Sequence, residues 1–325
     1  MGIKRAAFGK ASKEKRTKPQ TEEEVKPEIE IEIDGDVDDE ELSEVYGLFA
    51  KLQSERDPKI ARGLIHECDR LLRERDEKDL TLPSKFHVVY AGSLLSLADP
   101  AIIDNQADEF RAAGLERIAI GLESLEEDTE SAIVSGIAAQ EIIQFLHTQI
   151  EEGKVKTESK SWLSKAVDLI KSKTVNSEIA KAAFKFVQLL EDLNPVDETD
   201  DVIDVLKTHK ESDDDATKSW ANCALGTFYL NKAAQSDSSA ESVDDINKDI
   251  LNQAITHLRE GLNDENTQSF VMLAEGLLQL AGVIEEEEDS TEDVGEVYSE
   301  ALRHLKKAQL LGHEDLREII ESLEE

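Results

Sequence analysis

The sequence Gly114-Leu-Glu-Arg-Ile-Ala-Ile-Gly121 decides the fold, because small residues stand seven positions apart with the large apolar Ile118 between them. On an α-helix these three positions share one face. The small residues let a second helix approach closely, and the large one fills the space beside them. The pattern returns at Ala254-Ile-Thr-His-Leu-Arg-Glu-Gly261 and Ala301-Leu-Arg-His-Leu-Lys-Lys-Ala308. It is typical of the second helix of a tetratricopeptide repeat.

Matching first helices are visible beside these segments, for example at 224–229 and 269–281. We therefore predict three repeat-like helical hairpins, at about 86–125, 217–262 and 267–312. Ala254 and Ala301 are 47 positions apart, whereas a standard repeat has roughly 34 residues. The repeats are thus degenerate, with charged inserts at 235–249 and 285–293 between the two helices of a pair. A plain helical bundle is the alternative to a repeat solenoid.

The composition predicts an all-α protein. The chain of 325 residues has only 6 prolines and 5% aromatic residues, and its abundant Glu, Lys, Leu and Ala are good helix formers. Alternating β-branched and polar residues, which a sheet would need, are almost confined to 28–33. We predict a degenerate tetratricopeptide-like repeat domain at 39–325, preceded by a disordered tail at 1–38 that is first basic and then acidic.

The first 18 residues carry seven cations and one acid. Such a cluster can bind an acidic groove of a nuclear import receptor. The candidate import residues are Lys13, Lys15, Arg16 and Lys18. A basic tail that only balances the charge of an acidic body is the alternative.

The net charge of −36 argues against direct binding to nucleic acids or anionic membranes. No apolar run approaches the roughly 20 residues that span a bilayer. Cys68 and Cys223 are far apart, which gives no disulfide framework and suits a reducing compartment. The sequence has no paired Cys-x-x-Cys motif, no phosphate-binding loop and no nucleophile elbow. We expect a protein that is not an enzyme, with no metal site and no cofactor.

The helix predicted around Gly63-Leu-Ile-His-Glu-Cys-Asp-Arg-Leu-Leu-Arg73 carries a resemblance to a known family. Together with the acidic segment 36–42 and the basic start of the chain, it resembles the fungal enhancer-of-translation-termination family. The resemblance implies a nuclear helical-repeat adaptor that binds an iron- and 2-oxoglutarate-dependent, prolyl-hydroxylase-like dioxygenase and supports translation termination. Iron and 2-oxoglutarate would belong to that partner. An import receptor and the termination machinery are further implied partners, and the nucleus is the expected location, with the cytoplasm left open.

Four polar residues of this helix are candidate partner-binding residues, because burial alone does not explain their identity. They are Glu67, Asp69, Arg70 and Arg73. They either contact the partner or fix the first helices in the shape that the partner recognises. An internal network, with Glu67 paired to Arg70 and Asp69 to Arg73, is the alternative. For the whole chain, the alternative function is an acidic, chaperone-like scaffold for basic client proteins.

Overall fold

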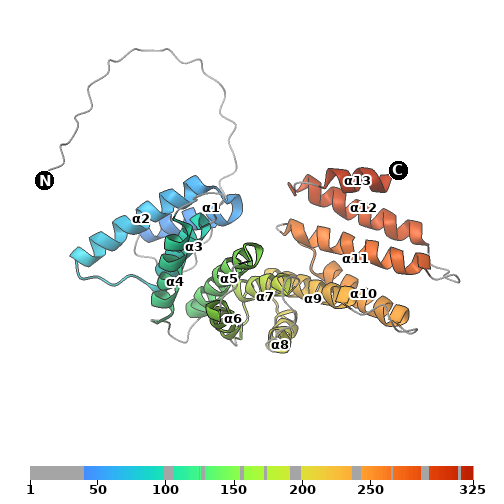
Figure 1. Ribbon diagram of the computed structural model, residues 1–325, viewed down its shortest axis with the longest axis horizontal. Helices are drawn as coiled ribbons and strands as arrows, with labels where there is room; N and C mark the ends of the chain where they lie inside the picture. The colour runs from blue at the N-terminus through green and yellow to red at the C-terminus, as the bar shows by residue number, and fades with distance from the viewer. Residues whose placement is uncertain are drawn as a thin grey trace, which may run out of the picture. The chain divides into compact units, whose positions relative to one another are not determined.

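The fold is known from a computed structural model of the chain (Figure 1). It describes residues 40–98, 106–123, 125, 129–153, 157–171, 174–190, 199–235, 243–264, 266–286, 293–313 and 316–324. Over these residues the secondary structure is helical and contains no strand, which confirms the all-α prediction. The tail at 1–38 lies outside the described residues, so its predicted disorder and its boundary remain predictions.

Thirteen helices follow one another along the described part of the chain (Figure 1). They are α1 (Glu40–Glu55), α2 (Pro58–Glu77), α3 (Ser84–Leu97), α4 (Ala107–Glu123), α5 (Thr129–Glu151), α6 (Thr157–Ile170), α7 (Ser177–Leu189), α8 (Thr199–His209), α9 (Asp215–Gln235), α10 (Val243–Glu260), α11 (Thr267–Glu286), α12 (Val294–Leu310) and α13 (Arg317–Glu324).

The three segments with small residues lie in α4, α10 and α12, and each helix packs on the helix before it. Gly261, just after α10, shows why a small residue is needed. A Cβ atom there would lie 2.7 Å from the backbone nitrogen of Cys223 and 3.0 Å from the carbonyl oxygen of Ser219, both in α9. The Ser219 hydroxyl also donates a hydrogen bond of 2.8 Å to the Gly261 carbonyl. The close helix approach expected from the sequence is therefore present.

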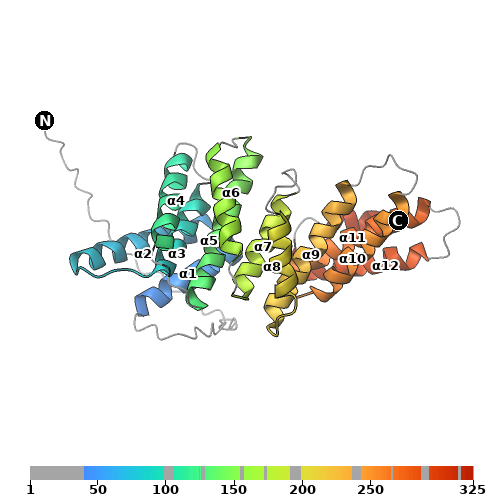
Figure 2. The same ribbon diagram turned by 90° about the horizontal axis from the view of Figure 1, so that it is seen from below.

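The odd-numbered helices α1, α3, α5, α7 and α9 pack on one another in chain order, and Figure 2 shows α5, α7 and α9 following α3. Beyond α9, α10 also packs on α11. This pairing and stacking of neighbours is the packing of a helical repeat. Between the first and second predicted hairpins, helices α5 to α8 continue the stack.

Helix α2 begins where the sequence predicts a break. Pro58 is its first residue, and the Asp57 side chain accepts a hydrogen bond of 2.8 Å from the backbone N–H of Lys59. This is an N-cap with proline in the first turn, the arrangement that favours a helix start. Residues of α2 that face the core are Ala61, Leu64, Cys68 and Leu71.

Two sequence-based expectations need correction. Helix α10 begins at Val243, so the second half of the 235–249 insert is helical. By length and composition, helix α11 could also cross a membrane, whereas no apolar run of that length was expected from the sequence. More than half of its most apolar window is buried, and Leu273, Leu277 and Ile284 belong to the core. Its apolar character is thus used in packing against α10 and α12.

Candidate partner-binding surface

Helix α2 exposes the polar face that the sequence singled out. The buried side chains of Leu64 and Cys68 point to the core, and Glu67, Asp69 and Arg70 are each partly exposed between that core and solvent. Arg73 is exposed. The four candidate residues thus share the accessible part of one helix, although the contacts they make differ.

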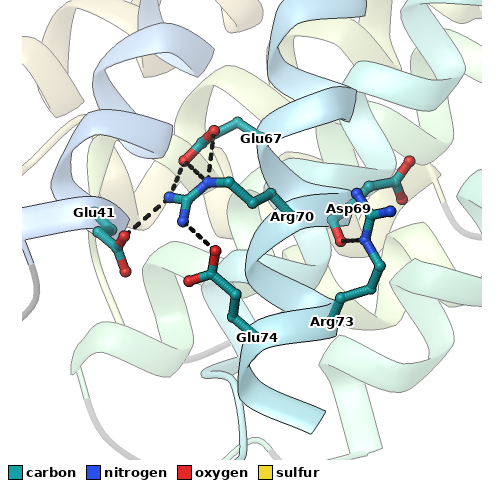
Figure 3. Close-up of polar contacts among 6 residues, drawn as sticks. All are labelled: Glu41, Glu67, Asp69, Arg70, Arg73 and Glu74. Atoms are coloured by element: carbon teal, nitrogen blue, oxygen red, sulfur yellow. Dashed lines mark hydrogen bonds and ion pairs between the residues drawn. The ribbon is translucent and has the colours of Figure 1, made fainter. Parts of the chain in front are cut away.

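Arg70 lies at the centre of a network of carboxylates (Figure 3). Its Nε donates to both oxygens of Glu67, at 3.0 and 3.1 Å, and its Nη2 also pairs with Glu67. Nη1 pairs with Glu74 at 2.7 Å, and Nη2 reaches Glu41 at the start of α1 at 3.0 Å. The Glu41 contact joins α1 to α2. The predicted pairing of Glu67 with Arg70 is therefore present, within a larger network.

The charges of this network stabilise one another. The hydrogen bond from Arg70 lowers the pKa of Glu67, and the hydrogen bonds that Arg70 donates to Glu67, Glu74 and Glu41 raise the pKa of Arg70. The Arg70 side chain is 37% exposed. Solvent screens an ion pair at such a position, so the network fixes side-chain directions more than it stabilises the fold.

Asp69 makes a different contact, with α3. The Tyr90 hydroxyl donates a hydrogen bond of 2.5 Å to Asp69 Oδ1, and Tyr90 is 6% exposed. Burial, followed by the hydrogen bond to Asp69, raises the pKa of Tyr90. The guanidinium carbon of Arg117, in α4, lies 5.1 Å from the centre of the Tyr90 ring. Asp69 thus takes part in a connection between α2, α3 and α4.

Arg73 does not form the pair that the sequence suggested. Its Nε donates a hydrogen bond of 3.0 Å to the backbone carbonyl of Asp69 (Figure 3). The Asp69 carboxylate instead accepts the hydrogen bond from Tyr90. The reason is the position of Tyr90, which comes from another helix and is invisible in the local spacing of α2.

The other candidates give no chemical site in the described part of the chain. Lys13, Lys15, Arg16 and Lys18 lie outside it. Cys68 and Cys223 are buried, and burial raises the pKa of each thiol to about 12, which opposes thiolate chemistry. Among the described residues, no group of three His, Cys, Asp or Glu side chains could hold a metal ion.

A cluster of charges between α1, α5 and α7 was not expected from the sequence. Glu141 is only 8% exposed, and its Oε1 accepts a hydrogen bond of 3.1 Å from Gln53 Nε2. Burial raises the pKa of Glu141, which the nearby charge of Lys185 partly offsets. Burial in turn lowers the pKa of Lys185. Charged residues at these two positions give no local signal of burial, because the helices that cover them are distant in sequence.

Comparisons with known proteins place this structure in a family. A protein-family model described as "Nuclear pore complex subunit Nro1" matches residues 1–222. Enhancer of translation termination 1 of Yarrowia lipolytica is 29% identical, over 89% of this chain and 87% of its own length. The Candida tropicalis protein of the same name is 23% identical, over 87% of this chain and 89% of its own.

A solved structure supports the fold independently. The nuclear import adaptor Nro1 of S. pombe superposes with a TM-score of 0.52 and 16% identity, covering 87% of this chain and 98% of that one. At this identity the likeness shows the fold alone. The family match spans more than half of the chain and includes the helix α2 that carries the candidate surface. The chain therefore belongs to the Nro1 family.

Proposed function

We propose that this protein is a non-enzymatic nuclear adaptor that holds a protein partner and takes part in translation termination. The observation that carries the proposal is the family match over residues 1–222. Relatives of this chain are named as an enhancer of translation termination and as a nuclear import adaptor. Stacked helical pairs suit such a role, because a repeat offers extended surface for another protein.

The partner in this proposal is an iron- and 2-oxoglutarate-dependent, prolyl-hydroxylase-like dioxygenase. This follows from the resemblance of 63–73 to the enhancer-of-translation-termination family. The iron and 2-oxoglutarate would be held by the dioxygenase, so the adaptor needs no cofactor of its own. An import receptor and the termination machinery would then contact other parts of the adaptor.

We assign different roles to the four candidate residues of α2. Arg70 and Glu67 join the start of α1 to α2, and Asp69 joins α2 to α3 through Tyr90. These three residues would hold the first helices in the arrangement that the partner recognises. Arg73 has an exposed side chain. Of the four residues, it is the one best placed to contact the partner directly.

Co-precipitation with the purified dioxygenase tests the proposal. Arg73→Ala should weaken capture with an unchanged melting temperature, and Asp69→Ala should lower both capture and melting temperature. Lys218→Ala, at an exposed site on α9, is the matched control. If the unmodified chain does not capture the dioxygenase, the dioxygenase is not its partner. If all variants capture it equally, α2 is not the binding surface.

The tail residues Lys13, Lys15, Arg16 and Lys18 are proposed to mediate nuclear import. Replacing all four by Ala should leave a fluorescent fusion of the full chain in the cytoplasm. Unchanged nuclear accumulation would show that import depends on another surface or on a carried partner.

The net charge of −36 favours a second candidate function, a chaperone-like scaffold for basic clients. Salt separates the two functions, because the Debye length falls to about 3 Å at 1 M ionic strength and screens exposed charges. A client complex held by charge should dissociate in high salt. A complex with an apolar interface core should remain.

A further inference from the structure

The face of α2 directed away from the core carries basic residues over most of its length, and the acids Asp76 and Glu77 are exposed only near its end. Lys59, Arg62, His66 and Arg73 are exposed and follow one another at steps of three, four and seven residues, so they lie along one side of the helix. Gly63 is exposed beside them. We call these five residues the basic face. It lies opposite the buried residues of α2, since the core-facing side chains occupy the remaining positions of the helical turn.

The first turns of this face carry cations in a chain that is acidic as a whole. The chain carries 73 acids against 37 bases, yet residues 58–66 contain no acid. Some exposed lysines elsewhere have carboxylate partners, as in Lys171–Asp201 at 2.7 Å and Lys307–Asp264 at 3.0 Å, whereas Lys218 and Lys232 form no such pair among the described residues. Within the described part of the chain, the Lys59 and Arg62 side chains form no such pair.

The helix itself does not favour these cations. Positive side chains near a helix N-terminus are opposed by the helix dipole, which favours negative charge there. Asp57 satisfies one backbone N–H at this end, that of Lys59. An anionic group lying along the first two turns would therefore interact favourably with both the side chains and the dipole.

Gly63 is a second and independent indication. It lies inside a helix of 20 residues, where glycine is less favourable than alanine by about 1 kcal/mol. Among the described residues no contact requires it, because a Cβ atom at this position would meet nothing within 4 Å, as is also true at Gly47 and Gly282. A glycine on an exposed helix face leaves room for another chain to approach the backbone closely.

We propose that the basic face of α2 binds an acidic, Asp- and Glu-rich segment of a partner protein, which crosses the helix at Gly63. The inference deepens the proposed function, since it states the chemistry of the partner segment at the same helix. A protein segment is favoured over nucleic acid because the strongly acidic chain repels a continuous phosphate backbone. An acidic peptide needs to contact only this local surface.

Fluorescence anisotropy with the full chain and a short glutamate-rich peptide tests the charge of the face. The double variant Lys59→Glu with Arg62→Glu should bind the peptide at least about tenfold more weakly, since charge reversal replaces attraction by repulsion. Lys218→Glu with Lys232→Glu is the matched control, because it makes the same change in net charge at exposed positions of α9. Equal losses in both double variants would overturn the proposal.

Gly63→Ala tests the close approach. The methyl group should leave the melting temperature equal or higher, because it favours the helix, and should weaken peptide binding several-fold. Gly282→Ala, in α11, also meets no atom within 4 Å and should leave binding unchanged. Binding by Gly63→Ala that equals that of the unmodified chain would overturn the proposed path of the peptide.

The same assay separates the alternatives. A single-stranded DNA of equal length should bind much more weakly than the peptide, and comparable binding would show a nonspecific polyanion site instead. If the charge-reversed chain loses its circular dichroism signal, Lys59→Gln with Arg62→Gln replaces it, with a smaller expected weakening because neutral side chains remove the attraction without adding repulsion. The measurement uses no dioxygenase, so a failed dioxygenase capture and a failed peptide titration are distinguishable results.

Discussion

The hydrogen bond between Asp69 and Tyr90 can be tested by three variants: Asp69→Ala, Tyr90→Phe and the two combined. The bond is 2.5 Å long and connects α2 to α3. Tyr90 is 6% exposed, so Asp69→Ala leaves its hydroxyl without this acceptor in a site that water hardly reaches. We expect each single variant to be less stable than the unmodified chain and the double variant to lose less than the sum.

The expected loss of stability follows from the negative charge of the Asp69 carboxylate, which accepts the hydrogen bond. Hydrogen bonds to charged groups contribute about 1.5–3 kcal/mol, and a buried unsatisfied group costs about 1–3 kcal/mol. We therefore expect Asp69→Ala to lower the free energy of unfolding by about 2 kcal/mol, and the coupling between the two positions to be about 1–2 kcal/mol. For a domain of roughly this size that corresponds to about 4–8 °C in melting temperature.

Thermal unfolding and hydrogen exchange should be measured together. Each helical pair contacts mainly its neighbours, so the loss should appear first as faster exchange in α2 and α3. Arg70→Ala serves as the comparison, since its ion pairs are screened and it should change stability less than Asp69→Ala. A coupling energy below about 0.5 kcal/mol would mean that the two residues act independently and would refute the reasoning.

Three further outcomes follow from the contacts. Gly261→Ala should cost about 1–3 kcal/mol in chemical denaturation, because its methyl group would meet the backbone of α9, whereas Gly282→Ala should not destabilise. Asp214 caps α9, and hydrogen bonds to its carboxylate lower its pKa. Asp214→Ala should therefore cost about 0.5–2 kcal/mol at neutral pH, a difference that disappears as acid protonates the carboxylate below its lowered pKa. Glu141→Gln and Lys185→Met should each lower the free energy of unfolding, and the double variant should be more stable than either single variant. The stability of the Lys185→Met variant should fall as pH rises, because burial raises the pKa of Glu141 and so opposes ionisation of its carboxyl group in the folded state. If the effects of the two substitutions simply add in the double variant, the proposed interaction between Glu141 and Lys185 is contradicted.

The spacing of small residues along the sequence was enough to predict the hairpins in which glycine or alanine lets two helices pack closely. The same sequence pattern does not reveal helix α5, and the packing of that helix explains why. Gly136 does lie against α7, where a Cβ atom would be 2.6 Å from the carbonyl carbon of Glu178. Four positions later, however, stands Gln140 rather than a large apolar residue, and its amide donates to Glu178 Oε2 at 2.8 Å. A buried polar contact has taken the place of the apolar residue that the pattern requires.

Only some of the contacts that the candidate residues of α2 make were predictable from the sequence. The sequence placed Glu67 and Arg70 within reach of each other, because both lie on one helix. It could not show that Glu41 and Tyr90 would join them, since those contacts depend on how α1 and α3 pack against α2. The cations of the basic face are visible in the sequence, where residues 58–66 contain no acid, but their exposure depends on how α2 packs.

The arrangement of the helices makes α2 a surface whose role can be isolated by mutation. In a stack of repeats, stability is close to a sum of each unit and its contacts with neighbours. A change on the exposed side of α2 should therefore leave α9 to α12 folded, since α2 packs on α1 and α3. If a variant of the basic face abolishes partner capture while exchange in α9 to α12 stays the same, the loss is local to α2. If capture persists, the partner must be bound through the later repeats, and the cations of α2 serve another ligand or none.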